Sequence, residues 1–229
     1  MALTDRLRVA AVAPRAVLAF ARLVRDPSRL DEVFTILDVL EKSGGGEVIV
    51  REFADDPRHA RAFRERPRVG PLDLDALGRL PKGTLGRAFA DEMRERGLDP
   101  AAIQMREDDG TDAGYVFAHL RETHDVWHTA TGFDVDVAGE LGLQAFYLTQ
   151  FSAQLSQIIL AMGFLNGALF APGERLARMD EIARGWRMGR ACRPLFGFDW
   201  AAHWDRPLAE VRAKLGLVVD DAAPATLAA

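Results

Sequence analysis

Two histidines spaced four residues apart are the first candidates for chemistry in this chain. His124 and His128 fall in residues 113–128, which contain no proline and have glycine only near their start, so we expect a helix there. A spacing of four brings both imidazoles to the same side of a helix, one turn apart, which suits a single metal ion. Phe117 and Leu120 precede them at helical spacing. The pair is therefore expected on the buried face of the helix.

Two carboxylates complete the predicted metal site. Asp125 lies about 100° round the helix from His124. Two roles are open for its carboxylate: a metal ligand at the edge of the site, or a hydrogen-bond acceptor that orients an imidazole. Glu140 follows His128 after eleven intervening residues and begins a long uncharged stretch. A carboxylate buried there would be costly without a cation. We therefore predict one divalent metal held by His124, Asp125, His128 and Glu140, and the mixed nitrogen and oxygen donors suit zinc, iron or manganese.

Other interpretations of the same residues compete with a metal site. The histidines of a His-Asp-x-x-His run can also be core or helix-end groups with no ligand. Asp125 stands where a His-Glu-x-x-His metalloprotease carries its catalytic glutamate, so the protease class is disfavoured. A metal-dependent phosphatase or nuclease needs more acidic ligands than this segment offers. The remaining histidines are isolated and are expected to be structural or exposed: His59, His119 and His203.

The elements that must position these side chains are predominantly helical. Apolar residues recur at helical spacing and strand signals are sparse, which predicts an all-α, single-domain helical bundle over residues 1–221 with a disordered tail at 222–229. Residues 80–84 are typical of a turn that ends in a helix N-cap at Thr84, and the following helix is expected to close at Gly97.

The stretch from residue 141 to residue 173 contains no charged side chain. It is long enough to span a bilayer. However, polar residues interrupt it, and Gln150, Gln154 and Gln157 fall on one face of a continuous helix. We expect this helix at the centre of a bundle or in the wall of an apolar cavity. Peripheral membrane contact through this region, or through the apolar stripe at residues 10–24, stays open.

Composition excludes several classes of protein. The net charge of −5 argues against a nucleic-acid binder, which normally carries a basic excess. Cys192 is the only cysteine and cannot form an internal disulfide. The N-terminal residues lack the basic and then unbroken apolar pattern of a secretory signal. We therefore expect a cytoplasmic protein, with possible peripheral contact at the inner face of the cell membrane.

The His124-Asp125-x-x-His128 motif, followed by eleven residues and Glu140, resembles the signature of the Coq-four family of ubiquinone-biosynthesis proteins. Further landmarks recur in order: Arg66-Pro67-Arg68, Leu80-Pro81-x-Gly83-Thr84-x-Gly86-Arg87-Ala88, Arg121-Glu122, and Arg206-Pro207-Leu208-x-Glu210-x-Arg212 ahead of Leu215-Gly216. The similarity covers residues 15–217. One departure is Leu120, where the family often has an aromatic or other bulky residue.

The resemblance implies an all-α fold, often dimeric and peripheral to a membrane, with an apolar cavity for a prenylated ligand. It implies an enzyme that replaces the carboxyl of a 4-hydroxybenzoate-derived ubiquinone precursor by hydroxyl, an oxidative decarboxylation at the metal, alongside other ubiquinone-biosynthesis proteins. The Gln144–Ile159 wall and the Phe117 and Trp127 region are candidates to hold the prenyl tail. The alternative is a non-catalytic lipid-binding scaffold whose metal is structural.

Overall fold

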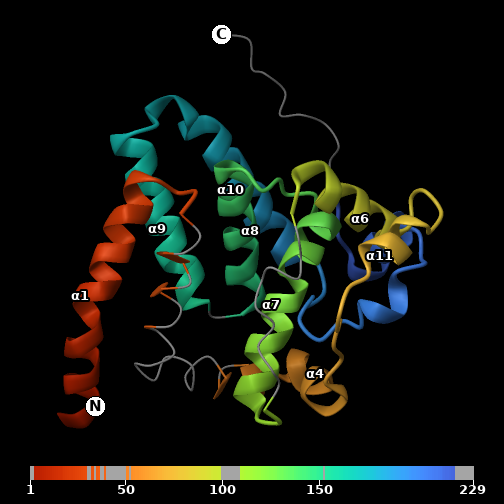
Figure 1. Ribbon diagram of the computed structural model, residues 1–229, viewed down its shortest axis with the longest axis horizontal. Coiled ribbons are helices and arrows are strands. Elements are labelled where there is room, and N and C mark those ends of the chain that lie inside the picture. Colours follow the sequence, from red (N-terminus) through yellow and green to blue (C-terminus); the bar gives the residue numbers. More distant parts are fainter. Residues whose placement is uncertain are drawn as a thin grey trace. The chain divides into compact units, whose positions relative to one another are not determined.

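The described part of the chain is predominantly helical. The computed structural model describes residues 3–29, 32–33, 35–36, 39, 50–51, 53–98, 109–151 and 153–219. No strand occurs among these residues, and an isolated bridge between Thr84 and Pro207 is their one β-type pairing. The predicted all-α fold class is therefore confirmed (Figure 1). The predicted disordered tail at 222–229 lies outside the described residues.

The helices form two compact units, one from residues 1–55 and 135–186 and the other from residues 56–134 and 187–229. The first unit contains α1 (Leu3–Arg25), α8 (Val137–Gln150), α9 (Gln154–Leu169), the short helix η3 (Pro172–Glu174) and most of α10 (Arg175–Ala191). The second contains η1 (Pro57–His59), α4 (Ala60–Glu65), α5 (Leu74–Gly78), α6 (Leu85–Arg96), α7 (Asp112–Thr131), η4 (Ala201–His203) and α11 (Leu208–Leu215).

In the first unit α9 packs against both α1 and α8. The buried cluster at this junction consists of Ala19, Leu23, Val24, Ile36, Leu141, Ala145, Ile159, Leu160 and Met162. Gly163 lets α9 approach α8 closely, because a Cβ at this position would lie 2.4 Å from a methyl carbon of Leu141. Asn166 Nδ2 donates to the carbonyl oxygen of Val24 at 2.8 Å and so satisfies one of the last carbonyls of α1.

The uncharged stretch is two helices, so the predicted continuous helix through Gln150 and Gln154 is wrong. Helix α8 ends at Gln150, where Phe151 takes an extended backbone (φ −162°, ψ 170°), and α9 begins at Gln154. The Phe151 ring lies 4.4 Å from that of Phe53 and 5.5 Å from that of Tyr147, measured between centroids. This aromatic packing overrides a local pattern that would otherwise continue the helix.

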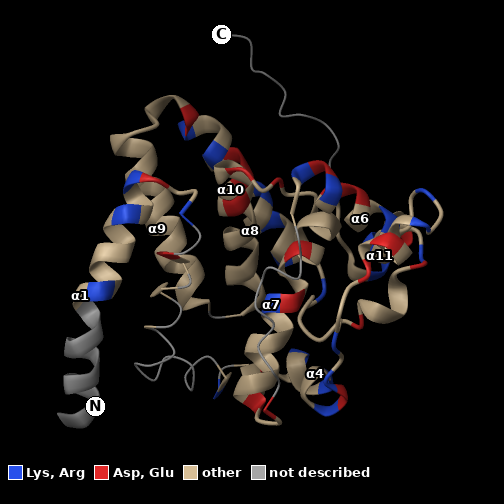
Figure 2. Cartoon of the chain, in the orientation of Figure 1, with Lys and Arg blue, Asp and Glu red and all other residues tan. Residues whose placement is uncertain are grey.

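None of the described helices is by itself both long and apolar enough to cross a bilayer. Helix α9 passes that test only together with residues 172–191, and the pair is bent by 117° at the break between them. Figure 2 shows α9 without any Lys, Arg, Asp or Glu, whereas charged residues follow along α10.

In the second unit the beginning of α6 is as predicted. Thr84 caps the helix, its hydroxyl accepting from the N–H of Arg87 at 3.4 Å, and Gly97 ends it in a left-handed conformation (φ 64°). Two segments far apart in the sequence meet here, through the bridge between Thr84 and Pro207. The flanking hydrogen bonds run from Leu85 N–H to the Arg206 carbonyl and from Leu208 N–H to the Gly83 carbonyl, each at 2.8 Å.

Candidate metal centre

Helix α7 carries the histidine pair, and its ends are well defined. The Thr111 hydroxyl accepts from the N–H of Gly114 at 2.9 Å, which caps the start of the helix. At the other end Gly132 has a left-handed backbone (φ 70°), and its N–H donates to the His128 carbonyl at 2.8 Å. The predicted helix over residues 113–128 is confirmed and extends by about one turn at its C-terminal end.

The two imidazoles lie next to each other, as their spacing predicts. Their ring centroids are 4.9 Å apart and the ring planes are nearly perpendicular (89°). His128 is buried and His124 is half-buried. His128 Nδ1 is 3.0 Å from the carbonyl oxygen of Phe133, so the ring proton sits on Nδ1 and the lone pair on Nε2. This is the arrangement in which a backbone carbonyl orients an imidazole toward a metal.

Glu140 lies in the first turn of α8. Asp136 caps that helix, its side chain accepting from the N–H of Gly139 at 2.7 Å. One ligand atom each from His124, His128 and Glu140 lie within 4.8 Å of one another. Metal bonds to such donors are about 2.1 Å long, so this spacing is compatible with one ion. Two imidazole nitrogens and one carboxylate oxygen fit zinc, ferrous iron or manganese.

Asp125 is half-buried and does not belong to this group of three. Its backbone carbonyl accepts from the Thr129 hydroxyl at 3.4 Å, a bond within the helix. The predicted role of its carboxylate, at the edge of the site or behind an imidazole, stays a prediction.

A buried carboxylate, Glu122, lies two residues before His124 on α7. Its Oε1 accepts from Arg68 Nε at 2.8 Å and from the Val69 N–H at 2.9 Å, and lies 3.7 Å from Nδ1 of His119. Burial raises the pKa of Glu122, but the His119 ring, the Arg68 guanidinium and the Val69 N–H lower it, and the lowering prevails. The charged side chain thus fastens residues 68–69 to α7.

His119 is structural, as its isolation in the sequence predicts. Its Nδ1 lies 3.0 Å from the Pro67 carbonyl oxygen, and its Nε2 accepts from the Gly197 N–H at 3.0 Å. One ring therefore ties α7 to two loops. The sequence marked Arg68 and Glu122 only as recurring landmarks. Their contact joins residues too distant in the chain for spacing to predict.

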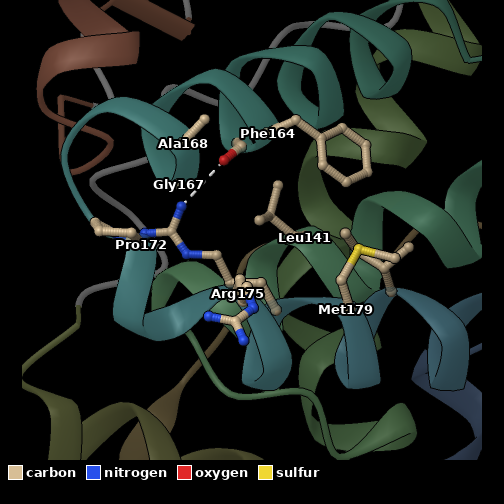
Figure 3. Close-up of a pocket in the computed structure, with 10 residues that line it drawn as sticks. Leu141, Phe164, Gly167, Ala168, Pro172, Arg175 and Met179 are labelled. Carbon is tan, nitrogen blue, oxygen red and sulfur yellow. Dashed lines mark hydrogen bonds between the residues drawn. The ribbon is translucent and has the colours of Figure 1, made fainter.

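A pocket of about 300 Å³ lies in the first unit, between α9 and α10. Its walls are mostly apolar and consist of Leu141, Gly163, Phe164, Gly167, Ala168, Pro172, Arg175, Arg178, Met179 and Ile182. Figure 3 shows Leu141 between Phe164 and Met179. The Arg178 guanidinium is almost fully buried and donates to the Gly163 carbonyl at 3.0 Å. Phe117 and Trp127, which we expected beside a prenyl tail, do not line this pocket and are buried.

Comparison with known proteins decides the family. The family model described as coenzyme Q (ubiquinone) biosynthesis protein Coq4 matches residues 10–221. The chain belongs to the Coq4 family. The resemblance found in the landmarks is therefore confirmed over nearly the whole chain, and the histidines and Glu140 lie inside the matched region.

Relatives of the Coq4 family resemble this chain at moderate identity. The mitochondrial ubiquinone biosynthesis proteins COQ4 of Vanderwaltozyma polyspora and Yarrowia lipolytica are 27% and 29% identical to it, over 75% and 71% of this chain. The chain spans 50% and 62% of their respective lengths. A crystal structure from Nostoc punctiforme, described as that of a putative ubiquinone biosynthesis protein, is 33% identical, with a TM-score of 0.76, covering 90% of this chain and 98% of that one.

Proposed function

We propose that this chain acts in ubiquinone biosynthesis as a metal-dependent enzyme that replaces the carboxyl group of a prenylated 4-hydroxybenzoate-derived precursor by hydroxyl. The observation that carries the proposal is the group formed by His124, His128 and Glu140. Three protein donors leave coordination positions open for a substrate, which distinguishes such a site from a closed structural one. Membership of the Coq4 family supplies the pathway.

The chemistry requires an oxidant. Replacing an aryl carboxyl by hydroxyl takes one oxygen atom from water, releases carbon dioxide and removes two electrons and two protons. Dioxygen accepts these and leaves as hydrogen peroxide, which balances the reaction. His124, His128 and Glu140 would hold a divalent ion, which would supply Lewis acidity to stabilise negative charge on the substrate. The chain's part is orientation: the Phe133 carbonyl fixes the tautomer and direction of His128, and the capped start of α8 holds Glu140.

The pocket between α9 and α10 supports binding of the isoprenoid tail. The volume of about 300 Å³ lies at the lower end of the usual range for ligand pockets. The residues that line the pocket are mainly apolar. The partners in this proposal are the prenylated precursor and other ubiquinone-biosynthesis proteins. The homodimer and the peripheral membrane contact implied by the family resemblance belong to the same proposal.

A non-catalytic lipid-binding scaffold is the second candidate, and the same pocket favours it. The test uses purified protein loaded separately with zinc, iron or manganese, a carboxylated prenyl-phenol and dioxygen, with the hydroxylated product followed by mass spectrometry. We expect product from the wild type and none from His128→Ala or Glu140→Ala, both of which should still bind the lipid. His203→Ala is the matched control, because this half-buried histidine contacts Asp199 and Lys214 and does not belong to the group of three ligand residues.

Two outcomes contradict the proposed enzymatic activity. If a variant that has lost its metal forms product at the wild-type rate, the metal has no role in the reaction. No product from metal-loaded wild type, combined with joint loss of lipid binding and melting temperature in the His128 and Glu140 variants, supports the scaffold with a structural metal.

A further inference from the structure

We propose that Arg212 is a positioning residue for the metal centre: its guanidinium holds the last turn of α7 and thereby fixes the direction of His128. The inference rests on the proposed metal site and adds a residue outside it. Arg212 lies on α11, far from the histidines in the sequence, and its side chain donates hydrogen bonds to α7.

Arg212 donates hydrogen bonds to the C-terminal end of α7. The last carbonyls of a helix have no N–H partner within the helix. Here the Gly132 N–H serves the His128 carbonyl. Arg212 serves the next two, with Nε donating to Ala130 at 2.9 Å and Nη2 to Thr129 at 3.1 Å. A positive charge at this end also favours the helix dipole.

Phe133 connects the last turn of α7 to the imidazole of His128. The chain leaves α7 at Gly132 and passes directly to Phe133, whose carbonyl lies 3.0 Å from His128 Nδ1. A turn that frays at Thr129 and Ala130 moves the Phe133 carbonyl, and the His128 ring then loses the acceptor that sets its direction. A short, continuous set of bonds therefore links the Arg212 guanidinium to the direction of the His128 ring.

The helix that carries Arg212, α11, is anchored at its start. Helix α11 begins at Leu208, whose N–H donates to the Gly83 carbonyl, and the bridge of Thr84 with Pro207 lies beside it. Val211 and Leu215 of the same helix are buried. The guanidinium is thus presented from an anchored helix, and its planar fork suits two neighbouring carbonyls better than a lysine ammonium does.

The test is a metal titration on apo protein, with Co²⁺ as the probe and its visible absorption as the readout, repeated with Zn²⁺ in competition. We expect Arg212→Gln to weaken binding about 10–100-fold, the usual effect of losing a group behind a ligand, and to change the Co²⁺ spectrum. Arg212→Lys should be intermediate. Melting temperatures are measured in parallel, and titrations are run well below them.

The matched control is Arg94→Gln. Arg94 also donates to a backbone carbonyl of the second unit, that of Leu74 at 2.9 Å, and pairs with Asp75, but it makes no such bond to α7. We expect it to lower the melting temperature without changing metal affinity. Wild-type affinity in folded Arg212→Gln, or equal weakening in Arg94→Gln, overturns the positioning role. If Arg212→Gln does not fold, Arg212→Lys decides by the same comparison. No metal uptake by the wild type overturns the metal site itself.

Discussion

At the scale of single residues, the role of Asp125 in the candidate metal centre can be measured. It follows His124 directly yet does not belong to the group of three ligand atoms. We expect Asp125→Asn to lower metal affinity about 10–100-fold, as changes behind a ligand do, whereas His128→Ala should abolish binding. Metal content and isothermal titration on the two variants measure the difference.

Asp205→Asn controls for the lost charge, since Asp205 is exposed and far along the chain from α7. Loss of metal in Asp125→Asn as complete as in His128→Ala makes Asp125 a direct ligand. Unchanged affinity removes it from the site.

At the scale of elements, the contact of α8 with α10 depends on two glycines. A Cβ on Gly185 would lie 1.9 Å from the carbonyl oxygen of Gly142, which is backbone and cannot rotate away. Alanine is otherwise the better helix former by about 1 kcal/mol. We nevertheless expect Gly185→Ala to lower the free energy of unfolding by about 3 kcal/mol, at the upper end for overpacking. Urea unfolding followed by circular dichroism measures it.

Gly173→Ala is the matched control, because nothing lies within 4 Å of its added Cβ. It should change the free energy of unfolding by less than about 0.5 kcal/mol. A Gly185→Ala protein as stable as the wild type contradicts the close approach of α10 to Gly142.

The elements also show what the sequence could and could not predict. Helix α7, the histidine pair and the first-turn position of Glu140 follow from local spacing and capping, so they were predictable. The break at Phe151 was not, because it depends on packing against Phe53, nearly a hundred residues earlier. The bonds of Arg212 to α7 were hidden for the same reason.

At the scale of the whole molecule, large apolar side chains gather on the exposed end of α9 and the start of α10. The four with more than half of their surface exposed are Phe164, Leu169, Phe170 and Leu176. Exposed apolar patches of this kind mark contact with a protein or a membrane. The peripheral membrane contact in our proposal would use this surface, with the exposed Arg175 beside it facing lipid phosphates.

The prediction is co-sedimentation with vesicles of anionic phospholipid. The double variant Phe164→Ser/Leu169→Ser should lower the partition coefficient at least tenfold, which corresponds to about 1.4 kcal/mol. Val218→Ser is the control, because Val218 is exposed to a similar degree in the other unit. Equal partitioning of the double variant and the wild type excludes this surface as the membrane contact.

The bridge between Thr84 and Pro207 also has a consequence for biosynthesis. During translation α6 and α7 leave the ribosome before the segment that contains Pro207 and Arg212 has been made. At about 5–20 residues per second, the histidine helix waits several seconds for the groups that complete its last turn. A message cut short before codon 206 would yield both histidines without the arginine that holds their helix. We therefore expect the proposed metal site to form only after the segment that contains Arg212 has been synthesised.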